Sequence, residues 1–395
     1  MTTAKRSATW TPHFIRLSSM LFVIEFVRSA LLISFLPAYA VGHLGISLTA
    51  VGLAVSIHYL ADTGVKVAAG YLLDRFSSRL MLHLSFAASL AGLWAVFYGH
   101  QPWLLVVGAV LLGIGGSPVW LICLSSIRDQ GRGSQMGAIY TVWLASLGAG
   151  PIALNFVMDQ GYALSFWLLM ALLIVGWGIA LRSKFEAVSA LPTVSLKDQL
   201  KQLKGRLTLM KPLVPGMVLQ TAAAGLLVPV LPTFATNQLG LDYSGYSLVL
   251  IVGGVVTAAG LIPMGRLSDR WGHRRFLVAG FFGLAAALIM LLSSSGLPST
   301  MLLASVLGLS YAIVLPSWNA VLSTFVPNEQ KGTGWGVLSS IEGIGVMIGP
   351  MLGGWVAGRF NETVTVAVSA CLLAAIALFY LLVPQGRLIP GKAAD

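Results

Sequence analysis

Twelve long apolar segments, separated by short polar or glycine-containing stretches, dominate this sequence. Most hold roughly 20 apolar residues, the length that an α-helix needs to cross the hydrocarbon core of a bilayer. Only 9% of the residues are charged and 57% are hydrophobic, too few charges for the surface of a water-soluble protein of this size. The sequence therefore predicts an all-α membrane protein with twelve transmembrane helices. The segments are Phe14–Ala40, Leu48–Leu73, Leu80–Gly99, Trp103–Ile127, Gln135–Met158, Leu164–Leu181, Leu213–Thr236, Ser244–Leu267, Phe276–Ser294, Ser299–Phe325, Gly334–Gly358 and Val364–Val383.

A short charged turn occurs twice between these segments, at residues 70–82 and 265–277. Each copy has a glycine, an Asp–Arg pair four residues later and a trailing basic residue, and the second copy follows the first by 195 residues. Other matches at offsets of 195 to 199 residues are Leu36-Pro37 with Leu231-Pro232, Pro118 and Trp120 with Pro316 and Trp318, and Gly150-Pro151 with Gly349-Pro350.

These repeats indicate that a six-helix half is duplicated, which predicts two pseudo-symmetric six-helix bundles. The expected domains are residues 1–182 and 212–395, joined by a cytoplasmic linker over residues 183–211. Two parallel halves of this kind place a binding site near the middle of the membrane, between them.

The net charge of +11 would also suit a protein that binds nucleic acid. However, placing both termini in the cytoplasm puts 21 of the 24 lysines and arginines on that side, which is the bias that orients membrane proteins. We therefore expect cytoplasmic termini and no nucleic-acid partner. In the linker, residues 196–207 have an amphipathic helical pattern, which fits either a helix on the membrane surface or a solvated connection.

Motifs of catalysis are missing from the sequence. It has no Walker sequence, no nucleophile motif and no cluster of metal ligands, so we expect a protein that is not an enzyme, needs no metal or cofactor and does not itself use ATP. Cys123 and Cys371 fall inside apolar segments, where they are expected to pack as small apolar residues.

Ionisable residues occur inside the first two segments. Such residues cost at least ~2.5 kcal/mol at the centre of a spanning helix, so they persist where they line a polar cavity. Glu25 and Arg28 are three residues apart and share one face of a helix, and His58, Asp62 and Lys66 form one stripe at a spacing of four.

This pattern favours a proton-handling pocket in the first half. Glu25 and Asp62 are the expected proton-coupling carboxylates, and Arg28 and Lys66 would hold them ionised until the substrate or the conformation changes. The alternative is that two self-neutralising ion pairs only pin the helices together.

Tryptophans adjoin prolines in the fourth and tenth segments. Trp120 follows Pro118, and Trp318 lies between Pro316 and Asn319. A proline favours a kinked helix, and an aromatic ring that faces a cavity is a surface on which sugar rings stack. The alternative is that both tryptophans simply pack between helices.

The two halves differ in polarity, because Glu342 is the one charged residue away from the ends of the spanning segments in the second half, against five charged or histidine residues in the first. Trp143 and Glu342 are related by the 199-residue offset and should face equivalent places. A charge-rich half opposite an apolar half suits an amphiphile with a polar headgroup and acyl chains. The candidate substrate-binding residues are Glu25, Arg28, His58, Asp62, Lys66, Trp120, Trp143, Trp318, Asn319 and Glu342.

The two charged turns resemble the loop motif of the major facilitator superfamily, and the resemblance covers the whole chain. It implies that Asp74, Arg75, Asp269 and Arg270 form a conformational latch on the cytoplasmic side. A carboxylate can bind an arginine bidentately or the exposed amides of a helix N-terminus. The first copy has Ser77 where a glycine is usual. The alternative is a plain cluster of charges that stops translocation.

Further motifs resemble the family of flippases that carry the glycolipid anchor of lipoteichoic acid in Gram-positive bacteria. They are residues 25–28, 56–62, 112–120 and 315–319. The resemblance implies a proton-coupled antiporter in the bacterial cell membrane that moves a diglucosyl-diacylglycerol-type lipid, with a monomer as the simplest form. Its partners would be the glycolipid, protons and membrane lipid. The rival on the same fold is a proton-driven multidrug or sugar efflux antiporter.

Overall fold

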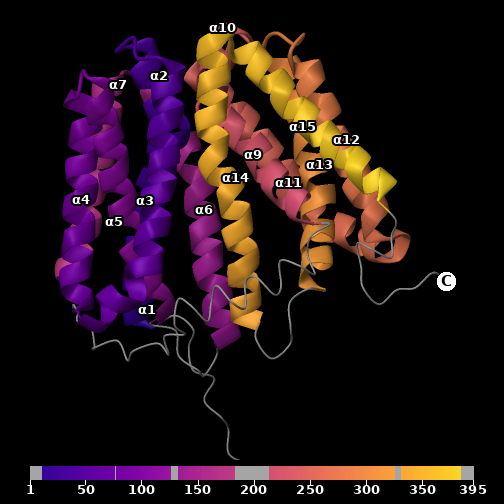
Figure 1. Ribbon diagram of the computed structural model, residues 1–395. Coiled ribbons are helices and arrows are strands. Elements are labelled where there is room, and N and C mark those ends of the chain that lie inside the picture. Colours follow the sequence, from indigo (N-terminus) through magenta and orange to yellow (C-terminus); the bar gives the residue numbers. More distant parts are fainter. Residues whose placement is uncertain (1–10, 76, 126–131, 183–212, 325–330, 384–395) are drawn as a thin grey trace, which may run out of the picture. The chain divides into compact units, whose positions relative to one another are not determined.

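The computed structural model describes residues 11–75, 77–125, 132–182, 213–324 and 331–383 (Figure 1). Every regular element in these ranges is a helix, and eleven helices are long and apolar enough to cross a membrane, or twelve if one bent pair is a single span. The predicted all-α membrane fold is confirmed. The linker at residues 183–211 lies outside the described ranges.

Contacts divide the chain into two compact units, one made from the described parts of 1–46 and 57–193 and the other from 47–56 and 194–395. The helices of the first half are α1 (Pro12–Ala30), η1 (Leu31–Phe35), α2 (Leu36–Gly42), α3 (Leu48–Arg75), α4 (Ser78–Tyr98), α5 (Pro102–Ser125), α6 (Arg132–Met158) and α7 (Tyr162–Leu181). Those of the second are α9 (Val214–Leu227), α10 (Leu231–Asn237), α11 (Tyr243–Trp271), α12 (His273–Leu291), α13 (Leu297–Ser323), α14 (Lys331–Arg359) and α15 (Glu362–Leu382).

The start of α3 belongs with the second unit. Thr49 donates its hydroxyl to the carbonyl of Gly354 at 3.1 Å, and Ser56 Oγ accepts the backbone N–H of Met351 at 2.9 Å. The sequence-based boundary assigns the whole of this helix to the first half, whereas its first turns pack on α14.

The first span runs through α1, η1 and α2 without a break, but η1 is a π-helical segment in which the N–H of Leu36 bonds to the carbonyl of Leu31. Each such turn holds one more residue than an α-helical turn, and segments of this kind are frequent at functional sites. The apolar pattern of residues 14–40 did not predict it. The segment shifts the later residues of the span around the helix axis and lies against α6.

The seventh span is broken, since α9 and α10 meet at an angle of 46°. Pro229 lies in the turn between them and Pro232 in the first turn of α10. Proline has no N–H to donate and crowds the preceding turn, so it bends a helix. The predicted single segment from Leu213 to Thr236 is therefore two helices.

Glycines allow the same close approach of helices in both units, where α1 packs on α6 and α9 packs on α14. A Cβ on Gly150 would lie 2.5 Å from the carbonyl oxygen of Phe26, and one on Gly349 would lie 2.7 Å from that of Ala222. Gly150 and Gly349 are partners in the sequence repeat. The repeat therefore corresponds to equivalent helix contacts within each unit.

The two charged turns differ in backbone geometry. Ser77 has φ −63° and caps α4 by accepting the N–H of Leu80 at 3.2 Å, whereas Gly272 has φ +92° between α11 and α12. The first turn therefore does not need the glycine that is usual there. Both Asp–Arg pairs lie in the last turn of a helix, α3 or α11, rather than in a loop.

Replacing Gly272 with alanine should destabilise the second unit by about 1–3 kcal/mol, because a side chain at this φ is strained. Gly254→Ala in α11 is the matched control, since a Cβ there meets no atom within 4 Å. Thermal unfolding of the purified protein in detergent measures the difference. Equal unfolding temperatures for the two variants would contradict the strained turn.

Candidate functional site: a buried charged cluster

A buried ion pair occupies the middle of the first unit. Arg28 Nε donates to Glu25 Oε2 at 2.9 Å, and Arg28 Nη2 also contacts this oxygen. The Glu25 side chain is 5% exposed and that of Arg28 is 12% exposed. Their spacing of three residues on α1 brings them together, as the sequence predicts.

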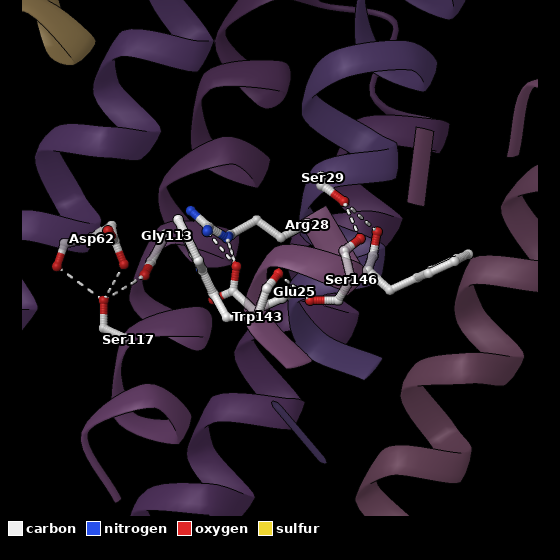
Figure 2. A network of polar contacts seen from close by, with 9 residues as sticks. Glu25, Arg28, Ser29, Asp62, Gly113, Ser117, Trp143 and Ser146 are labelled. Carbon is white, nitrogen blue, oxygen red and sulfur yellow. Dashed lines mark hydrogen bonds and ion pairs between the residues drawn. The ribbon is translucent and has the colours of Figure 1, made fainter. Parts of the chain in front are cut away.

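Asp62 on α3 lies on the other side of the guanidinium, within electrostatic range of Arg28. Ser117 on α5 donates its hydroxyl to Asp62 Oδ1 at 2.5 Å and contacts the Asp62 carbonyl at 2.9 Å. Figure 2 shows Arg28 between the carboxylates of Glu25 and Asp62. Three helices thus contribute to a single polar cluster, which we call the charged cluster: Glu25, Arg28, Asp62 and Ser117.

Helices α3 and α5 approach closely beside this cluster. A Cβ on Gly113 would lie 2.5 Å from the carbonyl oxygen of His58, and one on Gly116 would lie 3.5 Å from Cδ of Arg28. His58 is fully buried and its Nδ1 contacts the carbonyl of Ala109 at 2.9 Å. The structure therefore places His58 in the α3–α5 contact.

Hydroxyl groups continue the polar contacts from α1 to α6. Ser29 contacts the carbonyls of Phe26 at 3.1 Å and Ser146 at 3.2 Å, and Ser146 donates to the carbonyl of Trp143 at 2.7 Å (Figure 2). Ser29 thus links α1 to α6, whereas the hydroxyl of Ser146 bonds within α6, one turn from Ser146.

Three aromatic rings adjoin the charged cluster, and we call them the aromatic trio: Trp120 on α5 with Tyr140 and Trp143 on α6. The ring centroid of Trp120 lies 5.3 Å from that of Tyr140 and 6.1 Å from that of Trp143. Trp120 is three residues from Ser117, so the two residues lie on the same face of α5, about one turn apart. Both tryptophans are half-buried, and Tyr140 is 48% exposed.

A second polar group lies in the other unit around Glu342 of α14. Its Oε1 accepts Trp318 Nε1 from α13 at 2.9 Å and Gln220 Nε2 from α9 at 3.1 Å. Thr221 donates to the backbone carbonyl of Glu342 at 2.8 Å. Trp318 is 3% exposed, so its indole serves this hydrogen bond rather than an open face, and Asn319 beside it is exposed.

The sequence repeat relates these two polar groups. Gln220 follows Glu25 by 195 residues, Trp318 follows Trp120 by 198 and Glu342 follows Trp143 by 199. In the first unit Trp120 of α5 forms an aromatic contact with Trp143 of α6. In the second unit Trp318 of α13 donates a hydrogen bond to Glu342 of α14. The expectation that Trp143 and Glu342 take equivalent places agrees with these contacts.

The latch residues are described in part. Asp269 is exposed, and its Oδ1 lies 3.9 Å from Nε2 of His273, one turn further along the chain. Arg270 is exposed. The side chains of Asp74, Arg75 and Lys66 lie outside the described parts of the structure.

Sequence reasoning missed several polar partners, chiefly Ser117 and Gln220. A lone serine or glutamine in an apolar segment gives no spacing signal. The repeat itself held a signal for Gln220, since the 195-residue offset relates it to Glu25.

Two carboxylates lie beside one guanidinium in the charged cluster. Buried charges are costly in a membrane interior, and a proton that binds either carboxylate would change the net charge of the cluster. The described residues contain no group of three or more His, Cys, Asp or Glu side chains that could hold a metal ion. The cluster is thus suited to proton exchange and to polar headgroups.

Residues 17–211 and 213–394 match the Major Facilitator Superfamily. The chain is 32% identical over 375 residues to the proton-coupled antiporter flippase LtaA of Staphylococcus saprophyticus, a match that covers 93% of each protein. It is 31% identical over 377 residues to LtaA of Staphylococcus aureus, covering 93% of this chain and 94% of the relative.

Solved transporters share the fold. The nucleoside transporter NupG superimposes with a TM-score of 0.75 at 12% identity and covers 94% of this chain and 98% of its own. A mutant of the peptide transporter POT, solved with sulfate, gives a TM-score of 0.72 at 14% identity over 96% of both chains. At these identities the likeness is one of fold alone.

Proposed function

The chain belongs to the major facilitator superfamily, and from this premise we propose that it is a proton-coupled antiporter that flips a glycolipid across the bacterial cell membrane. The observation that carries the proposal is the charged cluster, in which Glu25 and Asp62 share Arg28 within a spanning bundle. The lipid we favour is the anchor of lipoteichoic acid, because the relatives that match over 93% of the chain are proton-coupled antiporter flippases.

In this proposal the charged cluster exchanges a proton for the lipid headgroup. With the cluster deprotonated, Arg28 has two carboxylates to neutralise, and protonation of either one frees hydrogen-bonding capacity on the guanidinium. Hydroxyl groups of a sugar can use the same donors and acceptors. Proton and headgroup would therefore compete for one set of charges, which is the requirement for exchange of one for the other.

The aromatic trio would hold the sugar rings of the headgroup. Trp120 and Trp143 are half-buried. Trp120 lies one helical turn from Ser117 of the charged cluster, and Trp143 lies one turn from Ser146, whose carbonyl accepts a bond from Ser29 next to Arg28. A ring held over an aromatic face makes apolar contact while its hydroxyl groups reach the polar side chains. The remaining substrate contacts that we propose are His58, Lys66, Trp318, Asn319 and Glu342.

The acyl chains would contact the second unit, in whose spanning helices Glu342 is the one charged residue away from the helix ends. We further propose cytoplasmic termini, a monomer and a latch formed by Asp74, Arg75, Asp269 and Arg270 in one conformation. The contact of Asp269 with His273 leaves this carboxylate on the exposed end of α11, where another partner can reach it.

The substrate is tested in proteoliposomes of the purified protein that contain a fluorescently labelled diglucosyl-diacylglycerol. We expect a pH gradient to accelerate the movement of this lipid between leaflets, as followed by quenching with a membrane-impermeant reductant. A parallel assay that measures extrusion of a cationic drug tests the rival function, multidrug efflux. Drug extrusion without gradient-dependent lipid movement would contradict the proposal.

Glu25→Gln and Asp62→Asn should each remove the response of flipping to the pH gradient, leaving the rate at that of protein-free liposomes. Each variant keeps an oxygen that accepts hydrogen bonds and loses the proton that is exchanged. Asp159→Asn is the control, since Asp159 is exposed beyond the end of α6. Wild-type gradient responses in both cluster variants would disprove the role of these acids.

A further inference from the structure

Glu342 differs from the acids of the first unit in having neutral partners. Its Oε1 accepts two N–H donors, the indole of Trp318 and the amide of Gln220, and no hydrogen bond joins its Oε2 to another described residue. The residue is half-buried near the middle of α14. It therefore holds one fixed oxygen and one oxygen that is available to a further ligand.

No described lysine, arginine or histidine lies within ion-pair distance of Glu342. The charged residues of α14 itself, Lys331 and Arg359, lie at its ends. On the helices around it, α9 contributes no titratable side chain, and the first turns of α3 contribute none. The titratable group on α13 is the phenol of Tyr311, within electrostatic range. Those on α15 are Glu362 at its first residue, Cys371, and Tyr380 beside Trp318.

The repeat shows what has changed relative to the first unit. The position related to Glu25 is Gln220, and the position related to Arg28 is Ala223. The carboxylate of Glu342 thus lies beside the position related to Glu25, and among the described residues of the second unit no guanidinium forms an ion pair with it. An ionised carboxylate without a counter-charge is costly in a membrane interior, and a proton is the smallest ligand that removes the cost.

From this arrangement we propose that Glu342 is a second proton-binding site, in the second unit, and that it takes up and releases a proton during transport. The proposal rests on the proposed proton-coupled function and assigns it a further site. The proton adds to Oε2 from water and returns to water, so one O–H bond forms and breaks. Trp318 and Gln220 donate to Oε1 in both states and keep the carboxyl group in place.

A role as a structural pin or as an acceptor for a substrate hydroxyl is distinguished by Glu342→Gln. Glutamine keeps an oxygen for the N–H groups of Trp318 and Gln220 but cannot titrate. The matched control is Glu362→Gln at the exposed start of α15, where the carboxylate likewise accepts an amide, from Asn237 at 3.2 Å.

The first measurement is direct proton uptake by the detergent-purified protein on acidification, followed with a pH-indicator dye and by the infrared band of protonated carboxyl groups. We expect Glu342→Gln to take up about one proton fewer than the wild type and to lose part of the band, while Glu362→Gln keeps the membrane-buried component. If Glu342→Gln does not fold, Glu342→Asp should shift the midpoint of uptake. Unchanged uptake and an unchanged band in these Glu342 variants would overturn the proposal.

The second measurement is flipping of labelled glycolipid. Acceleration by a pH gradient should fall by about 5- to 150-fold in Glu342→Gln, the usual range of coupling between two ligands, while exchange without a gradient continues. Loss of exchange with normal proton uptake would instead mean that Glu342 serves structure or substrate contact without binding the proton, and would overturn the proposal. Absence of glycolipid movement in the wild type would refute the proposed function, and proton uptake would still decide the role of Glu342.

Discussion

Arg28→Met is expected to lower the free energy of unfolding by about 3–5 kcal/mol, the usual cost of removing one partner of a buried ion pair. Methionine fills most of the space of the arginine stem but removes the positive charge that contacts Glu25 and lies within electrostatic range of Asp62. Because Arg28 is central to the charged cluster, transport of glycolipid should also fall to background. Unfolding in detergent and flipping in proteoliposomes measure the two effects.

Arg359→Met is the control for this prediction, since Arg359 is exposed at the end of α14. The double variant Glu25→Gln with Arg28→Met should regain much of the lost stability, because it also removes the carboxylate that Arg28 contacts directly, yet it should remain inactive. If Arg28→Met unfolds like the control variant, the ion pair does not have the energetic role that its burial indicates.

Gly353→Val should separate α14 from α9 and strongly reduce the yield of folded protein. A Cβ on Gly353 would lie 2.1 Å from the carbonyl oxygen of Leu226 and 2.7 Å from its Cα. These are backbone atoms, which cannot rotate away as a side chain can, so the cost should reach about 3 kcal/mol or more. Size-exclusion chromatography and thermal unfolding measure folded yield and stability.

Gly343→Val on the same helix is the matched control, because a Cβ at Gly343 meets no atom within 4 Å. There the expected change in stability is small, about 0.3 kcal/mol or less in either direction, since valine is a slightly better helix residue than glycine but is β-branched. Similar losses in both variants would show that helix propensity rather than close backbone contact governs this part of the second unit.

Much of the fold could be predicted from the sequence, because a spanning helix needs a run of apolar residues whose length is set by the bilayer. The irregular parts could not. The π-helical segment Leu31–Phe35 depends on how this span packs against α6, and the 46° bend at Pro229 depends on which of two nearby prolines ends a helix. Hydropathy contains neither kind of information.

The charged cluster was predictable to the extent that it depends on spacing along one helix. Glu25 and Arg28 form a contact that their three-residue separation dictates, whereas Ser117 joins Asp62 from another helix and has no sequence signal. The latch shows the same limit. The sequence suggests an arginine or amide partner for Asp269, and the structure places its carboxylate beside His273, one helical turn away.

The second unit shows how a repeat can be informative beyond hydropathy. The offset that relates Trp120 to Trp318 also relates Glu25 to Gln220 and so predicts which neutral donor stands where the first unit has an acid. What it could not predict is that Trp318 would be buried and donate to Glu342. The hypothesis of an aromatic face for sugar rings therefore has more support at Trp120, which is half-buried.

The central claim is that proton and glycolipid movements are coupled through the charged cluster. The most direct test imposes a glycolipid gradient on proteoliposomes with equal pH on both sides and records the internal pH with a trapped dye. Coupled exchange predicts that lipid moving one way drives protons the other way in the wild type and that Asp62→Asn stops this proton flux. Lipid movement with no accompanying proton flux in the wild type would contradict the account.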